Sequence, residues 1–253
     1  MRWVLLKDLA AYFLPEVIDM KLRLRIIAGS LSVLVVAVLC LAYYVDGDDR
    51  SVFYASASVI REPTLIIDPG HGGFDGGAVA ADGTMEKELN LKLAKQLNEL
   101  SSALGYKTVM VRETDRSTDS DGEQSGSKKV KDIKNRLSLM KKYGDCTFVS
   151  IHMNKYSTSQ PHGTQVFYAP TEGSDVLAEA IQASVATMLQ TDNKRVIKPA
   201  GRDIYLMHNA TAVAVLVECG FLSNKNDLKN LKDDIYRRYL AFSILCGIIA
   251  SGK

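Results

Sequence analysis

The chain has 253 residues, of which 47% are hydrophobic and 24% charged, and its formal net charge at pH 7 is +2. These values are typical of a globular protein and exclude a disordered chain. A net charge so close to zero gives no reason to expect nucleic acid as a partner. The 4 cysteines form no C-x-x-C pair, so the sequence predicts neither a disulfide framework nor a cysteine-based zinc site.

An uncharged apolar stretch near the N-terminus, residues 26–45, has the length of a helix that crosses a bilayer. Basic residues precede it and acidic residues follow it, which predicts that residues 1–25 are cytoplasmic and that the rest of the chain is extracytoplasmic. We expect a retained transmembrane anchor rather than a cleaved signal peptide, because the A-x-A match at 55–57 lies well beyond the apolar stretch. Residues 46–62 are predicted to be a polar linker.

Strands and helices alternate in the rest of the sequence. A run rich in Asp, Ser, Gly and Lys at 115–131 predicts a mobile surface loop. The alternation predicts a single α/β domain over residues 63–253, with a mostly parallel or mixed central sheet and helices on both faces, preceded by one transmembrane or signal helix. In chain order, the expected elements are a strand at 64–68, a helix at 86–104, a strand at 107–111, a helix at 132–143, strands at 147–151 and 164–168, a helix at 174–189, a strand at 214–217 and a helical segment at 227–249 with a break near Asp233 and Asp234.

Three polar side chains follow apolar strands, namely His71, His152 and Glu218. Sites in α/β sheets gather just beyond the carboxyl ends of the strands, so we expect these side chains to lie close together. Two histidines of one sheet can converge on a catalytic zinc, which typically takes three protein ligands and leaves one position open for water. An acid near the start of the first helix could be the third ligand. Glu86 and Glu88 both qualify, or both merely complement the helix dipole.

Glu218 directly follows the apolar run AVAVLV. An acid at the end of a buried strand is expected to have a raised pKa unless a partner stabilises its charge. Such an acid suits a general base that takes a proton from water. The alternative is a structural carboxylate that caps the following turn.

Four motifs occur in order over residues 63–250, namely DPGHGGFDGGA, MEKELNLKLA, SIHMN and LVECGFLSN. Together they resemble the motifs of the zinc-dependent N-acetylmuramoyl-L-alanine amidases. The resemblance implies that His71, Glu86 and His152 bind zinc, and it selects Glu86 because the family ligand directly precedes a lysine. It also implies that Glu218 is the catalytic acid/base.

Further positions follow from the same resemblance. Arg136 and Asn154 fall at family-typical positions and are predicted to support the site. Val213 stands where family members usually have a proline, which could change the backbone that enters the last strand. The segment VECGFLSN, the single membrane segment and the lack of wall-binding repeats are most similar to the branch of the family that prepares the spore cortex for muramic-δ-lactam formation.

The resemblance also sets the expected function. The substrate is the amide between the lactyl group of N-acetylmuramic acid and L-alanine in peptidoglycan, the cofactor is zinc, and the catalytic domain lies outside the membrane, for a cortex enzyme between the two forespore membranes. The membrane, through the N-terminal segment, and an accessory sporulation protein are the further expected partners. The sequence does not distinguish cortex from vegetative wall as the substrate.

Two other functions remain open on the residues alone. A zinc peptidase on a similar sheet would cleave a peptide without sugar, and a non-catalytic wall-binding protein would have lost its metal. The presence of all four key residues argues against the second. A cysteine hydrolase built on Cys219 is a weaker alternative, because no histidine is obviously placed to activate the thiol.

Overall fold

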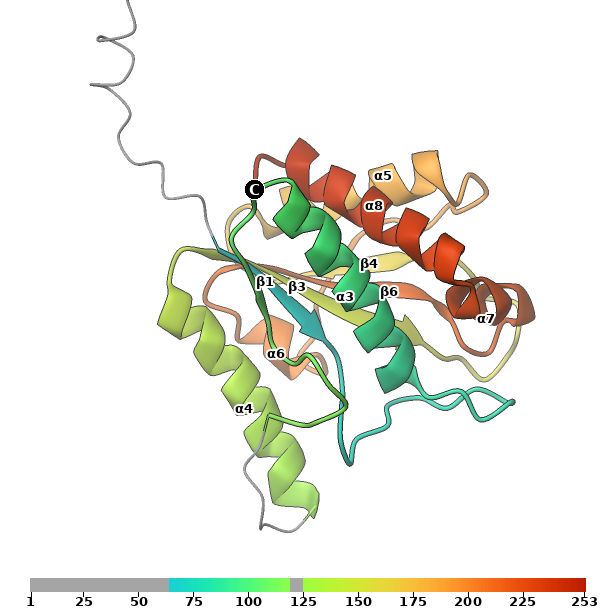
Figure 1. Cartoon of the computed structure of the whole chain (residues 1–253), viewed down its shortest axis with the longest axis horizontal. Helices are drawn as coiled ribbons and strands as arrows, with labels where there is room; N and C mark the ends of the chain where they lie inside the picture. Colours follow the sequence, from blue (N-terminus) through green and yellow to red (C-terminus); the bar gives the residue numbers. More distant parts are fainter. Residues whose placement is uncertain (1–63, 119–124) are drawn as a thin grey trace, which may run out of the picture. The chain divides into compact units, whose positions relative to one another are not determined.

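The computed structural model describes residues 64–118 and 125–253, which fold as one compact unit (Figure 1). The predicted membrane segment at 26–45 and the predicted linker at 46–62 lie outside the described residues. Within the described part of the chain, no helix is both long and apolar enough to cross a membrane. The anchor therefore remains a prediction.

A six-stranded mixed sheet forms the centre of the domain, with the strand order β2-β1-β3-β6-β4-β5. Neighbouring strands are parallel except for β4, which runs antiparallel to β6. This arrangement confirms the predicted mixed α/β sheet. The strands are β1 (Thr64–Pro69), β2 (Thr108–Met110), β3 (Cys146–Asn154), β4 (Gln165–Tyr168), β5 (Lys198–Pro199) and β6 (Val213–Phe221).

Helices cover both faces of the sheet, as predicted (Figure 1). Successive residues of a strand point to opposite faces, so the buried strands contribute side chains to both cores. Leu65 and Ile67 of β1 pack with α3, α5 and α8, whereas Ile66 packs with α4 and α6. The helices are α3 (Glu86–Ala103), α4 (Ser125–Tyr143), α5 (Ser174–Met188), α6 (Tyr205–His208), α7 (Lys225–Lys232) and α8 (Asp234–Ala250).

The predicted break in the last helical segment is confirmed at Asp233. Its carboxylate accepts a hydrogen bond from the main-chain N–H of Tyr236 at 2.8 Å and so caps the start of α8. An aspartate in this position satisfies an N–H group that has no partner within the helix. The cap explains why α7 and α8 are two helices rather than one.

The predicted loop at 115–131 is wrong in its second half, because α4 begins at Ser125. Met140 of α4 packs on the sheet. The lysine-rich residues before 132 continue this helix towards its N-terminus, because lysine is a good helix former. The prediction from composition alone therefore made the loop too long at its C-terminal end. Residues 119–124 lie outside the described residues.

The ends of two strands also differ from expectation. His152 and Glu218 were predicted to follow β3 and β6, but both strands continue, to Asn154 and Phe221. The two strands pair with each other along this extension, with His152 opposite Glu218, and this pairing holds the polar residues inside the ladder. The short elements β5 and α6 were not predicted at all.

Candidate metal centre and active site

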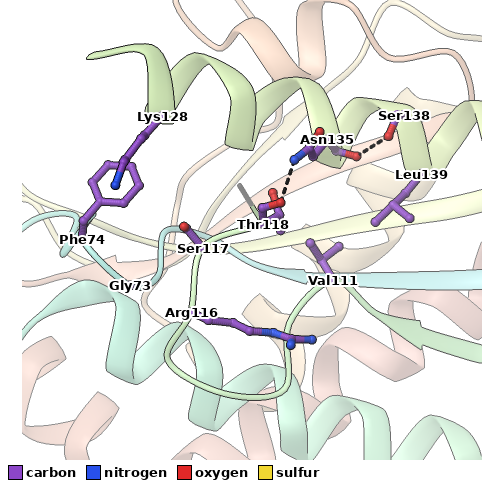
Figure 2. A pocket seen from close by; sticks show the side chains of 10 residues that line it. All are labelled: Gly73, Phe74, Val111, Arg116, Ser117, Thr118, Lys128, Asn135, Ser138 and Leu139. Carbon is purple, nitrogen blue, oxygen red and sulfur yellow. Dashed lines mark hydrogen bonds between the residues drawn. The ribbon is translucent and has the colours of Figure 1, made fainter. Parts of the chain in front are cut away.

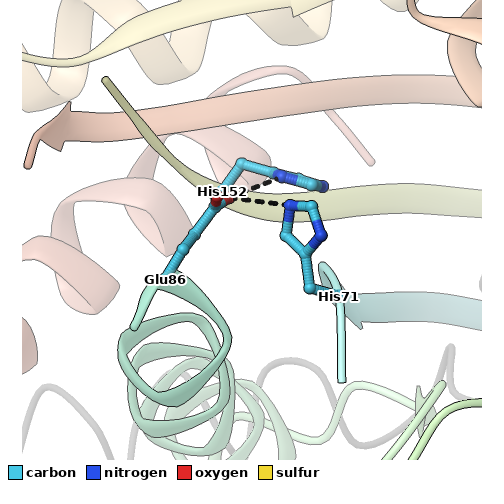
Figure 3. A group of neighbouring side chains, drawn as sticks. All are labelled: His71, Glu86 and His152. Carbon is cyan, nitrogen blue, oxygen red and sulfur yellow. Dashed lines mark hydrogen bonds and ion pairs between the residues drawn. The ribbon is translucent and has the colours of Figure 1, made fainter. Parts of the chain in front are cut away.

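His71, Glu86 and His152 converge at the carboxyl edge of the sheet (Figure 3). The Oε1 atom of Glu86 lies 3.2 Å from Nε2 of His71 and 2.9 Å from Nδ1 of His152. The three ligand atoms lie within 4.8 Å of one another. Two imidazoles and one carboxylate form a donor set that fits a zinc-type ion and leaves further positions for other ligands.

Two glycines make room for this cluster. A Cβ atom on Gly70 would lie 2.2 Å from Nε2 of His152, so any side chain there would collide with the imidazole. A Cβ atom on Gly77 would lie 2.6 Å from Oε2 of Glu86, and Gly77 also has a φ of +66°. His71 itself adopts a φ of 60°, a conformation that is uncommon for residues other than glycine and that often occurs at functional sites. The glycine-rich loop is therefore shaped around the donor set.

Glu86 is buried, with 4% of its surface exposed, and both of its oxygens have partners. Oε2 accepts a hydrogen bond from the N–H of Ala78 at 2.8 Å, and Oε1 accepts one from the N–H of Met153 at 3.1 Å. Burial alone would raise the pKa of Glu86, but the hydrogen bonds and charges of His152 and His71 outweigh it and hold the pKa well below its usual range. Glu86 is therefore an ionised carboxylate in a fixed position.

Asp75 orients His71 from the side away from Glu86. Its Oδ2 atom lies 2.9 Å from Nδ1 of His71, and its Oδ1 atom accepts the N–H of Gly77 at 3.2 Å. Nε2 of His71 faces Glu86, so a proton on Nδ1 alone leaves Nε2 available as a ligand atom. Burial lowers the pKa of His71, but the hydrogen bonds and charges of Asp75 and Glu86 outweigh burial and raise it to about 9. A histidine ligand that donates its other N–H to a carboxylate is common at metal sites.

Two buried arginines hold the main chain of the glycine-rich loop. Arg112 donates from Nε to the carbonyl of Pro69 at 2.9 Å and from Nη2 to the carbonyl of Gly70 at 3.0 Å. Arg136 donates from Nη2 to the carbonyl of His71 at 2.8 Å. Three consecutive carbonyls are thus fixed by guanidinium groups, which places the backbone that carries His71.

Arg136 is in turn held by two carboxylates. Its Nη1 pairs with Asp68, and its Nε donates to Oδ2 of Asp132 at 2.7 Å. Ser150 donates to the second oxygen of Asp68 at 2.7 Å. Burial would lower the pKa of Arg136, but these acids outweigh it and raise the pKa further above its usual value. Arg136 is therefore a permanently charged support of the loop.

Glu218 lies next to His152 but differs from Glu86 in its surroundings. The two residues are opposite each other in the ladder between β6 and β3, and Oε2 of Glu218 is buried without a hydrogen-bond partner among the described residues. Burial raises the pKa of Glu218 to about 7, with the charge of His152 acting in the opposite direction. The raised pKa that the sequence predicts is present, and a carboxyl with a pKa near neutrality suits proton transfer.

The other predicted residues take separate places. Glu88 is exposed on α3 and is not part of the donor set, so only Glu86 joins the histidines. Asn154 ends β3, where its main-chain carbonyl accepts the N–H of Leu222 at 2.7 Å. His162 is exposed and lies 3.7 Å from Asp192, outside the cluster.

The sequence did not single out Asp75, Arg112 or Lys87. Asp75 follows His71 by four residues in the same motif, and this position could have marked it as a partner of the histidine. Nothing in the sequence around Arg112, which lies just after β2, indicates its role. Lys87 donates to the carbonyl of Gly73 at 2.8 Å and to Asp115 at 2.7 Å, so the residue directly after Glu86 also anchors the loop.

Two cavities lie near the glycine-rich loop that carries His71. A cavity of about 230 Å³ is lined by His71 and His152 and by apolar residues such as Ile133, Ile204 and Leu216. A larger pocket of about 820 Å³ is lined by Gly73 and Phe74, by residues 116–118 and by α4, and does not contain the donor set (Figure 2). Its wall includes Asn135, which donates to the carbonyl of Thr118 at 2.6 Å. The small cavity is the one that adjoins the chemistry.

A mixed α/β sheet with two histidines, one ionised carboxylate and a second carboxyl of raised pKa has a donor set that fits a metal ion, as in metal-dependent hydrolases. The family model of the N-acetylmuramoyl-L-alanine amidases matches residues 65–250. The chain therefore belongs to this family. It is a hydrolase that acts as an N-acetylmuramoyl-L-alanine amidase on peptidoglycan.

Individual relatives agree with the family. The germination-specific N-acetylmuramoyl-L-alanine amidase of Bacillus subtilis (strain 168) is 32% identical over 187 residues, which cover 73% of this chain and 78% of that protein. The amidase LytC of the same organism is 30% identical over 82% of this chain, but the match spans only 40% of LytC. The CwlD amidase of Clostridioides difficile, solved in complex with the GerS lipoprotein, is 35% identical with a TM-score of 0.72, over 75% of this chain and 98% of that chain.

Proposed function

We propose that this amidase is zinc-dependent, with His71, Glu86 and His152 as the zinc ligands and Glu218 as the catalytic acid/base. The observation that carries the proposal is the contrast between two glutamates beside His152. Glu86 pairs with both histidines, while Glu218 has a buried oxygen that finds no partner among residues 64–118 and 125–253. Zinc bound to this donor set would polarise the lactyl carbonyl and make water a better nucleophile.

The side chains of the protein carry out the proton transfers. Glu218, as the carboxylate, takes a proton from the attacking water, and then delivers it to the nitrogen of L-alanine as the amide bond breaks. Its pKa of about 7 lets it exist in both forms near neutral pH. In the zinc-bound form, Asp75 would keep the one remaining proton of His71 on Nδ1 and leave Nε2 as the ligand atom. Arg136 supports the backbone at His71, and Asn154 closes the ladder beside the site.

The structure argues against a cysteine nucleophile at position 219. The Cys219 side chain is buried with 1% exposed, and burial raises the pKa of its thiol well above the usual value. A thiol of this kind is inert, because the thiolate is the nucleophile. The side chain packs in the apolar core with Val217 and Leu222.

The biological setting is also proposed. The similarity to a germination-specific amidase and to CwlD supports a role in spore cortex maturation or germination. The catalytic domain acts outside the membrane, as cell-wall amidases do, and residues 26–45 would anchor it there, with residues 1–25 in the cytoplasm and 46–62 as the linker. Because the related CwlD was solved in complex with a lipoprotein, we propose an accessory sporulation protein as a partner.

Digestion of purified peptidoglycan by the full-length protein tests the function. Mass analysis should find glycan with free lactyl carboxylates and peptides that begin with a free L-alanine amine. Cleavage of sugar-free stem peptides in place of the lactyl amide would instead identify a peptidase. Release of neither product would identify a wall-binding protein without catalysis.

A further inference from the structure

A row of side chains crosses the sheet beside the candidate active site. His152 of β3 is opposite Glu218 of β6, and Glu218 is opposite Gln165 of the antiparallel strand β4. Residues directly opposite each other project from the same face of the sheet, and in an antiparallel pair such as β4 and β6 their Cβ atoms are about 4.5–5.5 Å apart. Gln165 is therefore the neighbour of Glu218 on the side away from His152.

A register shift adds an aromatic ring to this face. His152 of β3 is opposite Glu218 of β6, and Asn154 is opposite Phe221. Two steps along β3 therefore match three steps along β6, so β6 has one extra residue there. An extra residue of this kind reverses the alternation of side chains beyond it. Phe221 therefore projects from the same face as Glu218, whereas in a regular strand it would project from the opposite face.

Arg195 lies over this ring. Its guanidinium carbon is 4.5 Å from the ring centroid of Phe221, its Nε donates to the carbonyl of His162 at 2.7 Å, and its Nη1 donates to Oε1 of Gln165 at 3.1 Å. Every one of these partners is neutral, and Arg195 forms no ion pair within residues 64–118 and 125–253. The side chain is half-buried. The result is an oriented cation with donors left over for an anion.

The direction of the substrate follows from the proposed roles. The carbonyl that is attacked lies at the donor set, and the nitrogen that leaves lies at Glu218, which gives it a proton. The peptide attached to that nitrogen then continues beyond Glu218, away from His152. This direction leads over Gln165 to Arg195.

We propose that Arg195 binds a carboxylate of the stem peptide, on the residue that follows L-alanine. The proposal rests on the proposed roles of the donor set and Glu218. Guanidinium groups bind carboxylates with directed, charge-assisted hydrogen bonds, and stacking on Phe221 fixes the plane in which they point. Arg195 is thus a specificity-determining residue for the peptide side of the substrate.

A pair of N-acetylmuramoyl peptides tests the proposal, in which the residue after L-alanine carries either a carboxylate or a carboxamide. For the full-length wild-type protein we expect kcat/KM to be roughly ten- to a hundredfold higher on the carboxylate, mainly through a lower KM, as for loss of one charged hydrogen bond. In Arg195→Gln the preference should fall to about twofold or less, with little change on the carboxamide. Arg195→Lys, which keeps the charge but loses the planar fork, should show an intermediate preference.

Lys194→Gln is the matched control, since it removes an exposed cation from the neighbouring position and should keep the wild-type preference. The inference is overturned if the wild type treats both substrates alike, or if Arg195→Gln keeps the preference. A purely structural Arg195 would lower the melting temperature and slow both substrates equally. If the wild type cleaves neither peptide nor intact peptidoglycan, the proposed function itself is wrong, which is a distinct result.

Discussion

Glu86 and Glu218 are two glutamates next to His152, and their surroundings differ in nearly every respect. Glu86 accepts main-chain hydrogen bonds on both oxygens and pairs with two histidines, so its pKa is far below the usual range. Glu218 has a buried oxygen with no hydrogen-bond partner in the described part of the chain, and burial raises its pKa to about 7. The same side chain is therefore held as a permanent anion in one place and as a titratable acid in the other.

Under the proposed roles, this difference would separate metal binding by Glu86 from proton transfer by Glu218. A ligand must be ionised and fixed, which hydrogen bonds achieve, whereas a general base must gain and lose a proton near the working pH. Environments that push the pKa values of two nearby carboxyls apart are how one fold supplies both functions. Substitutions on the metal-binding side, at Glu86 and the histidines, and on the proton-transfer side, at Glu218, test whether the two functions are independent.

The largest expected effect is on the binding side. His152→Ala removes one of three ligands, so the purified protein should lose both its zinc and its activity. The matched substitution is His162→Ala, because His162 is exposed and outside the cluster. Elemental analysis should find close to one zinc per chain in the wild type and in His162→Ala. Zinc loss in His162→Ala but not in His152→Ala would contradict the ligand set.

Asp75→Asn should give a smaller effect on the same side. Asp75 is not a proposed zinc ligand but contacts one, His71, at 2.9 Å, and it also accepts the N–H of Gly77. Loss of such a partner typically lowers metal affinity by about 10- to 100-fold, which competition with a chelator would measure. Asp82→Asn is the control, since Asp82 is an exposed aspartate that pairs with Lys232 and is not part of the donor set. Equal zinc affinities for the two variants would rule out a role for Asp75.

The smallest expected effect is on the free energy of unfolding and comes from the carboxyl group of Glu218. Its folded-state pKa of about 7 lies above the usual value of 4.5, so the neutral carboxyl contributes stability that is full below about pH 4.5 and is lost as the pH rises through 7. The zinc-free wild type should therefore lose roughly 2–3 kcal/mol relative to zinc-free Glu218→Gln over this range. Denaturant unfolding at the two pH values measures the difference, and parallel stability curves would show that Glu218 is not perturbed.

Much of this site could be predicted from the sequence, because its key residues lie in short motifs. His71, Glu86, His152 and Glu218 each stand beside an apolar run or at a helix start, where local pattern places them at one edge of the sheet. The choice of Glu86 over Glu88 needed the family resemblance, since both are first-turn acids of α3.

Arg136 was predicted as a support through the family resemblance, whereas Arg112 and Arg195 could not be predicted in this way. Arg112 holds carbonyls 42 and 43 residues away in the sequence, and Arg195 reaches Gln165 across 30 residues. Such contacts depend on tertiary packing and leave no periodic signal. The extension of β6 to Phe221 escaped prediction for a related reason, because pairing with β3 overrides the polar residue at 218.

The central claim is that Glu218 transfers protons without binding zinc, and one paired measurement tests it. Zinc content and kcat should be measured for Glu218→Gln and Glu86→Gln on the same peptidoglycan fragment. Glu218→Gln should keep about one zinc while kcat falls by about a hundredfold or more, the scale for loss of a general base, whereas Glu86→Gln should lose zinc and activity together. A zinc-free Glu218→Gln protein, or one that binds zinc and remains fully active, would contradict the account.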